Sequence, residues 1–232
     1  YDSTDKVLFS ADGFGKFGIP ETQEDWACEA RRYYFNIVGK YGPQVQNVLK
    51  KAKTVDIKMI LPLHGPIWRE NLNTIIDLYD KWSQYIPEVN GVLIAYASVY
   101  GHTENVAEVL ASKLNDAGVV VKLHDTSTTD SSYLVSDAFK YSHLVFASTT
   151  YNMGIFIKMD EALRDLVSHN IQNRTVAFIE NGSWAPCAGR VMKGMLETMK
   201  EIEIVEPMVT IRSAMKQGDI PALEALADAM LA

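Results

Sequence analysis

The loop SVYGHT, residues 98–103, carries the residue types that bind a phosphate group. It lies between the apolar run GVLIAYAS and a segment of helical period that begins near Thr103. A helix N-terminus offers unpaired N–H groups and the positive end of the helix dipole. The hydroxyls of Ser98 and Thr103 add neutral donors, and Gly101 lets the backbone approach a ligand closely. The spacing therefore predicts a phosphate site at the start of this helix.

The same loop contains no Lys or Arg, and the chain has no GxxxxGK[ST] pattern of the kind that nucleotide hydrolases use. A loop without a cation for further phosphates suits a single terminal phosphomonoester. The alternative interpretation is an ordinary N-cap at Thr103, with Glu104 behind it in an exposed first turn.

Two later strand ends carry hydroxyl and amide groups beside an aromatic ring. They are STTYNMGIF at residues 148–156 and ENGSWAPCAGR at residues 180–190. Open α/β sheets bind ligands at the carboxyl ends of their strands. A phosphate on the first loop and a flat ring between the other two is the arrangement that flavin mononucleotide (FMN) needs, although Tyr151 and Trp184 could instead be packing residues. We expect the FMN contacts to come from Ser98, Val99, Tyr100, Gly101, His102, Thr103, Thr149, Thr150, Tyr151, Asn152, Gly154, Asn181, Gly182, Ser183, Trp184 and Gly189.

Asp12 and His64 are the candidates for a metal site. Each follows a predicted strand beside small residues, in LFSADGFGKFG and LPLHGPIWR. A carboxylate and an imidazole suit iron or zinc, although a single pair this far apart in sequence is more often structural. The DGFGKFG stretch also matches GxGxxG, but a dinucleotide fingerprint requires a helix to begin at once, and Ile19 and Pro20 follow instead.

These candidates need two kinds of scaffold. From residue 91 onward, apolar β-branched runs alternate with helical segments near residues 103–117, 130–141, 158–169, 189–201 and 219–231. Five such units predict an α/β fold with a doubly wound, five-stranded parallel sheet. Residues 1–90 instead contain two strands, at KVLFSAD and VDIKMILPLHG, and three helices, within residues 19–42, 43–52 and 71–85. Because two strands make no stable sheet alone, this part looks like the end of a larger domain.

Composition fits two globular domains in 232 residues, with 47% hydrophobic and 22% charged residues. Residues 1–90 hold 11 basic and 12 acidic side chains, and residues 91–232 hold 11 and 17. The acidic second part argues against nucleic acid as a partner. No apolar run is long enough for a membrane span, the N-terminus does not resemble a signal peptide, and two Cys outside any CxxC predict a cytoplasmic location.

The whole chain resembles the flavodiiron proteins, also called A-type flavoproteins, through LFSADGFGKFG, LPLHGPIWR and SVYGHT. The resemblance implies the C-terminal part of a metallo-β-lactamase-like diiron domain at residues 1–86 and a flavodoxin-like FMN domain at residues 91–232. It implies that Asp12 bridges two irons and that His64 binds one of them, as catalytic residues. The family's other ligands lie in a His-x-Glu-x-Asp-His motif and a further His upstream, so we expect this chain to be a fragment whose N-terminal half-domain is elsewhere.

The resemblance also implies a function. FMN takes electrons from a rubredoxin-like donor and passes them to a diiron site, which reduces O2 to water or NO to nitrous oxide, in a head-to-tail homodimer. Three alternatives remain from the residues: a flavodoxin-like electron carrier or flavin or quinone reductase without a working metal site, a zinc hydrolase that uses Asp12 and His64, and a non-enzymatic binding module.

Overall fold

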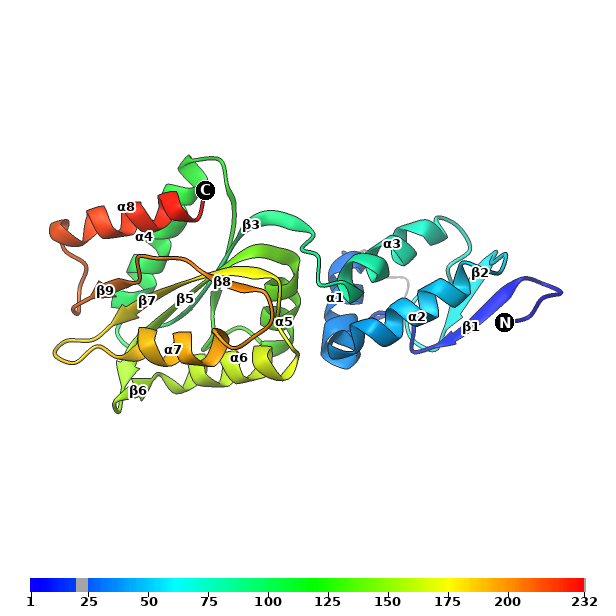
Figure 1. The fold of residues 1–232 in the computed structure, drawn as a ribbon, viewed down its shortest axis with the longest axis horizontal. Helices are drawn as coiled ribbons and strands as arrows, with labels where there is room; N and C mark the ends of the chain where they lie inside the picture. Colours follow the sequence, from blue (N-terminus) through cyan, green and yellow to red (C-terminus); the bar gives the residue numbers. More distant parts are fainter. Residues whose placement is uncertain (20–24, 232) are drawn as a thin grey trace. The chain divides into compact units, whose positions relative to one another are not determined.

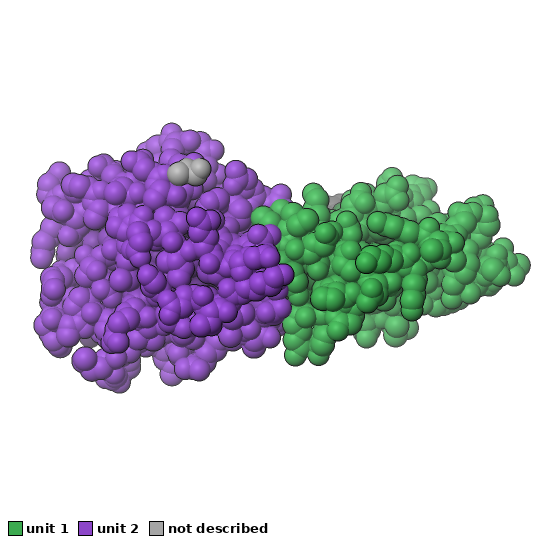
Figure 2. Space-filling model, viewed as in Figure 1, with its two compact units in different colours: residues 1–87 green, residues 88–232 purple. Residues whose placement is uncertain are grey.

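The computed structural model describes residues 1–19 and 25–231, in two compact units. Unit 1 is Tyr1–Pro87 and unit 2 is Glu88–Ala232 (Figure 2). Each unit is built around its own sheet. No helix of the described residues is both long enough and apolar enough to cross a bilayer.

Unit 2 contains the parallel sheet that the sequence predicts, in the strand order β4-β3-β5-β7 followed by β8 and β9 (Figure 1). These strands are β4 (Val120–Asp125), β3 (Val89–Ala97), β5 (Tyr141–Tyr151), β7 (Arg174–Asn181), β8 (Ile202–Ile204) and β9 (Val209–Ile211). The predicted fifth strand is split, since β8 and β9 both pair with β7 in parallel while Pro207 interrupts them. Proline lacks the N–H that a ladder needs, which accounts for the break.

Helices cover both faces of this sheet, so the predicted doubly wound fold is confirmed. One face carries α4 (His102–Asp116) and α8 (Ile220–Ala229), and the other carries α5 (Ser131–Lys140), α6 (Ile157–Ser168) and α7 (Ala188–Leu196) (Figure 1). Apolar side chains of α4 and α8, among them Leu110 and Leu226, bury the strand residues Ile94 and Val145. Nearly continuous apolar runs such as VLIAYA form these strands because both of their faces are covered.

Beyond its last parallel pair, β5 continues into a short hairpin with β6 (Gly154–Ile155). The two turn residues, Asn152 and Met153, have φ values of 49° and 61°. Positive φ at both central positions is the requirement of the tight hairpin turn that matches strand twist. Met is a costly residue there, so the turn is held by its context.

Unit 1 has a two-stranded parallel sheet of β1 (Val7–Ala11) and β2 (Met59–Pro62). Its helices are α1 (Trp26–Ile37), the short η1 (Gly39–Tyr41), α2 (Gly42–Ala52) and α3 (Leu72–Ser83). Buried rings of α1 and α3 pack together, with Tyr34 4.9 Å from Tyr79 and 5.3 Å from Trp82 between ring centroids. Part of the first predicted helix, residues 20–24, lies outside the described residues.

Candidate functional site

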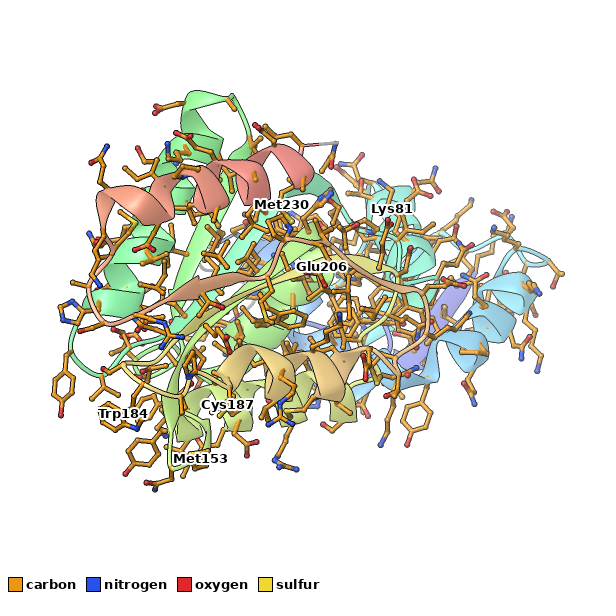
Figure 3. The ribbon with its side chains drawn as sticks, turned by 60° about the vertical axis from the view of Figure 1, so that its left-hand side comes forward. Lys81, Met153, Trp184, Cys187, Glu206 and Met230 are labelled. Carbon is orange, nitrogen blue, oxygen red and sulfur yellow. The ribbon has the colours of Figure 1, made fainter. Side chains whose placement is uncertain are left out.

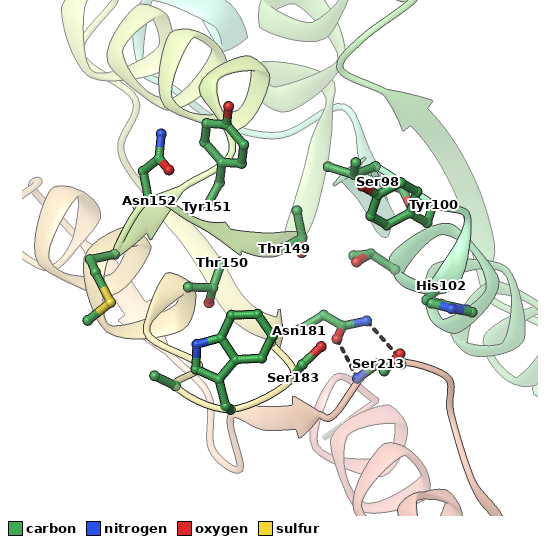
Figure 4. Close-up of a pocket in the computed structure, with 16 residues that line it drawn as sticks. Ser98, Tyr100, His102, Thr149, Thr150, Tyr151, Asn152, Asn181, Ser183 and Ser213 are labelled. Atoms are coloured by element: carbon green, nitrogen blue, oxygen red, sulfur yellow. Dashed lines mark hydrogen bonds between the residues drawn. The ribbon is translucent and has the colours of Figure 1, made fainter.

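A cleft of about 420 Å³ opens at the carboxyl ends of β3, β5 and β7, the sheet edge at which the sequence predicts a ligand. The loops after these strands supply its walls. Figure 4 shows Ser98, Tyr100 and His102 on one side and Tyr151 and Asn152 across from them. No Lys, Arg, Asp or Glu is among the described residues that line the cleft, so its polar groups are hydroxyls, amides, an imidazole and backbone N–H groups.

The first wall is the start of α4, and its N–H groups are open. Gly101 is the N-cap, with φ of 84°, and no side chain caps the helix. The Ser98 hydroxyl accepts a hydrogen bond from the N–H of Gly101 at 3.1 Å, which closes the loop onto itself. The first backbone bond of the helix runs from Asn105 to Gly101. In the described part of the chain, the N–H groups of residues 102–104 therefore have no acceptor.

Thr103 is the second residue of α4, not its N-cap, so the alternative interpretation of this loop is wrong. Its side chain is only 2% exposed and lines the cleft. Its hydroxyl has no hydrogen-bond partner within the described residues. The hydroxyl oxygen is not among the described buried atoms that lack a partner, so it is open to the cleft and can donate to a ligand there. Together with the three open N–H groups, it provides neutral donors of the kind that can hold an anion at a helix N-terminus.

The start of α7 borders the same cleft but is already satisfied. The Thr150 hydroxyl accepts hydrogen bonds from the N–H groups of Cys187 at 2.9 Å and Ala188 at 3.2 Å. The next N–H, of Gly189, donates to the Glu180 carboxylate at 2.9 Å. Thr150 and Glu180 thus occupy the N–H groups of residues 187–189 at the start of α7, whereas the first three N–H groups of α4 are open.

Asn181 at the end of β7 fixes the third wall. Its amide donates to the carbonyl of Ser213 at 2.9 Å and accepts from the N–H of Ser213 at 3.0 Å (Figure 4). Both polar atoms of the side chain are committed to the loop after β9. Asn181 therefore fixes the loop after β9 at the cleft that it also lines.

Large apolar side chains surround the cleft and face solvent. Trp184 is 87% exposed and Tyr100 is 88% exposed, and Met153 is also exposed. Figure 3 shows Trp184 and Met153 at the same edge of unit 2. Exposed rings grouped around a cleft mark a surface that a ligand or partner covers. Their placement makes Trp184 a rim residue and argues against a core packing role.

Most of the predicted cofactor-binding residues line this cleft. The exceptions are three glycines. Gly101 caps α4 behind the cleft wall, and Gly154 pairs with Tyr151 in the β5–β6 hairpin. Gly189 does not reach the ligand space, since a Cβ there would lie 2.1 Å from the sulfur of Met208, which makes it a packing glycine.

Three further lining residues were not predicted: Met153, Ala185 and Ser213. Met153 and Ala185 lie inside the predicted loops, but their apolar side chains gave no signal for a ligand contact. Ser213 lies 32 residues beyond its partner Asn181. The only sequence signal for Ser213 was its place after the last apolar run of the sheet.

In unit 1, Asp12 and His64 come together where β1 and β2 end. The Asp12 carboxylate oxygen lies 3.6 Å from Nε2 of His64, and both side chains are largely exposed. Two ligands of one metal ion, each at roughly 2.0–2.2 Å, lie about 3 Å apart, so the pair fits part of a metal site. Among the described residues no group of three or more His, Cys, Asp or Glu could hold a metal.

Tyr33 on α1 lines the same surface hollow as this pair. Its ring centroid is 6.0 Å from that of His64. Burial, and then the negative charge of Asp12, raise the pKa of the Tyr33 hydroxyl, so it stays protonated and can donate toward that carboxylate.

Comparison with known proteins matches the sequence model of the Flavodoxin family to residues 94–222. An uncharacterized protein of Methanocaldococcus jannaschii is 27% identical over 94% of this chain and 56% of its own length. The anaerobic nitric oxide reductase flavorubredoxin of Aeromonas hydrophila is 24% identical, over 88% of this chain and 43% of its own. In structure, the rubredoxin oxygen:oxidoreductase of Desulfovibrio gigas superposes with a TM-score of 0.90 at 25% identity, covering 98% of this chain and 59% of that one. The chain thus spans about half the length of the proteins it matches.

Proposed function

This chain belongs to the flavodoxin family and corresponds, over nearly its whole length, to the C-terminal portion of flavodiiron proteins, and on that premise we propose that unit 2 binds FMN for electron transfer. One observation carries the proposal. A single cleft combines an open helix N-terminus with a rim of exposed rings. A ligand with one phosphate and one flat ring system uses both.

Different residues would bind the phosphate and the ring. The N–H groups of residues 102–104 and the Thr103 hydroxyl would hold the phosphate, since they are donors without acceptors. Trp184, Tyr151 and Tyr100 would contact the ring or shield it from water. A bound flavin supplies one- and two-electron transfer, while the protein orients it and sets its surroundings. Because none of the described lining residues is Lys, Arg, Asp or Glu, the ring would lie in a neutral cleft.

We further propose that the electrons reach a metal centre that uses Asp12 and His64. The geometry of that pair supports the proposal, and the names of similar proteins suggest the chemistry: rubredoxin oxygen:oxidoreductase and anaerobic nitric oxide reductase. In this proposal a rubredoxin-like protein donates the electrons, and O2 or NO accepts them. Iron is the metal expected, with further ligands outside the described residues of this chain. Residues 1–86 would then belong to a metallo-β-lactamase-like domain.

The same proposal includes a partner that covers the cleft and a reducing cellular setting. The exposed rings of Tyr100 and Trp184 favour a covering partner, either the electron donor or a second subunit in a head-to-tail dimer. Both described cysteines are free thiols, which favours a reducing, cytoplasmic setting.

A cofactor assay tests the central claim. The purified protein, reconstituted with a mixture of FMN, FAD and riboflavin, should retain FMN after gel filtration, and the released cofactor should co-elute with FMN on reversed-phase chromatography. Retention of FAD alone, or of no flavin, would refute the proposal. Iron analysis of a sample that also contains the further ligands then separates a flavodiiron oxidoreductase from a flavin carrier without metal.

A further inference from the structure

A side-chain contact joins β3 to the first turn of α4, next to the open N-terminus of that helix. The hydroxyl of Tyr96, on β3, donates a hydrogen bond to Oε1 of Glu104 at 3.2 Å. Tyr96 is buried and does not line the cleft, and Glu104 is the third residue of α4. The contact therefore joins the end of the first sheet strand to the first turn of the helix that would hold the phosphate.

Glu104 occupies a position from which a glutamate usually caps its own helix. In a capping box, the glutamate at the third helical position reaches back to the N-cap N–H. In this protein that N–H, on Gly101, donates to Ser98 instead. A Cβ placed on Gly101 would lie 4.0 Å from Oε2 of Glu104, so the carboxylate is already close to the helix start. From the third helical position a glutamate side chain can reach back to the first turn of its own helix.

The charged groups around Tyr96 would direct a released Glu104 carboxylate toward the start of α4. The charged groups that act on the Tyr96 hydroxyl, besides Glu104, are Asp125 and Glu108, and both are acidic. A carboxylate freed from Tyr96 would move away from them and toward the positive end of the helix dipole. There it would occupy the donors that an anionic ligand needs and would repel its phosphate.

We propose that Tyr96 is a positioning residue, which holds the Glu104 carboxylate away from the N-terminus of α4 and so keeps the phosphate site open. The inference deepens the proposed function and rests on it. It explains why a helix with a glutamate in its first turn and a serine before its N-cap is nevertheless uncapped. Ser98 is used within the loop, and Glu104 is tied to the sheet.

Riboflavin provides the matched ligand for a test, because it has the ring system of FMN but no phosphate. The affinities of both flavins are measured by fluorescence titration for the unmodified protein, Tyr96→Phe, Glu104→Ala and the double variant. Tyr96→Phe should weaken FMN binding roughly ten- to 150-fold, the range expected when one hydrogen bond to a charged group is lost, and leave riboflavin binding unchanged. Glu104→Ala should bind FMN at least as tightly as the unmodified protein. In the Glu104→Ala background, Tyr96→Phe should have no further effect.

Each other result counts against the inference. Equal weakening of FMN and riboflavin by Tyr96→Phe would mean that Tyr96 only supports the fold, and so would an effect that persists without Glu104. Weaker FMN binding by Glu104→Ala would overturn the inference directly. This variant can be measured even if Tyr96→Phe does not fold. If the unmodified protein binds neither flavin, the proposed function fails first and the inference falls with it.

Discussion

Asn181 and Ser213 exchange two hydrogen bonds, between a side-chain amide at the end of β7 and the backbone of the loop after β9. The contact fixes one wall of the cleft from two segments that are distant in sequence. Every polar atom of the Asn181 amide head that could reach the ligand is used in this contact. The finding leads to the first prediction.

Asn181→Ala should loosen the loop after β9 and destabilise unit 2 by about 1–3 kcal/mol, since each of the two hydrogen bonds contributes about 0.5–1.5 kcal/mol. FMN binding should weaken as well, because the cleft wall is no longer fixed. Urea unfolding and flavin titration measure the two effects. Asn181→Asp keeps the acceptor for the Ser213 N–H but turns a buried carboxylate oxygen toward the Ser213 carbonyl, so it should destabilise unit 2 at least as much. An unaffected unfolding midpoint in Asn181→Ala would contradict a role for this contact.

Thr103→Val should weaken FMN binding by roughly 1.5–3 kcal/mol, the loss expected for one hydrogen bond to a charged group. Valine has nearly the same shape, so the fold should be retained. Riboflavin affinity serves as the control and should stay unchanged. Unaltered FMN affinity would mean that Thr103 is only a packing residue in the first turn of α4.

Trp184→Ala should restore the fluorescence of bound flavin. An indole in contact with the ring quenches emission, and its removal should also cost about 0.5–1.5 kcal/mol of binding beyond the loss of buried area. Trp184→Phe retains a ring and should keep more of the affinity than alanine does. Quenching and reduction potential that are the same in Trp184→Ala as in the unmodified protein would place Trp184 away from the flavin.

Substitution of the carboxylate–imidazole pair should remove metal without removing flavin. In the full polypeptide that carries this sequence, Asp12→Ala and His64→Ala should each lower the bound iron, measured by atomic emission, while the FMN content stays constant. If one variant still binds a single iron per chain, the result remains compatible with the proposal. Full iron occupancy in both variants would exclude Asp12 and His64 as ligands.

The alkaline stability of the protein should depend on Tyr96. Burial, followed by the charge of Glu104, raises the pKa of Tyr96 to about 12. A pKa raised on folding means that stabilisation is complete below the unfolded value, near 10, and is lost as the pH rises through about 12. The unmodified protein should therefore lose more stability than Tyr96→Phe between pH 9 and 11, by thermal unfolding. Parallel losses in the two proteins would contradict this shift.

The sequence was most informative where structure is local. The α4 loop follows from a strand, a glycine and a helical pattern within a few residues, and the structure places its hydroxyls at the cleft. The helix start is two residues earlier than a Thr103 cap would give, because Gly101 adopts the left-handed conformation. Such a shift depends on one dihedral angle, which residue type alone does not determine.

The features of the site that the sequence did not predict depend on contacts between distant segments. Thr150 lines the cleft, and the sequence did not indicate that its hydroxyl also accepts hydrogen bonds from Cys187 and Ala188. Glu180 reads as an ordinary strand residue, and its burial against Gly189 follows from the approach of α7. Helix α7 itself ends at Leu196, earlier than the apolar pattern suggested. Pairings of this kind appear only when the chain is folded.

The unequal starts of α4 and α7 also determine the direction in which a ligand can enter. Two helices begin beside one cleft, and one of them has its donors filled by Thr150 and Glu180. An elongated molecule that is charged at one end and flat at the other therefore has a single productive orientation. A reversed molecule would bring its anion to the start of α7, where Thr150 and Glu180 already accept the N–H groups of residues 187–189. The fold thus discriminates head from tail before any contact specific to the ring is made.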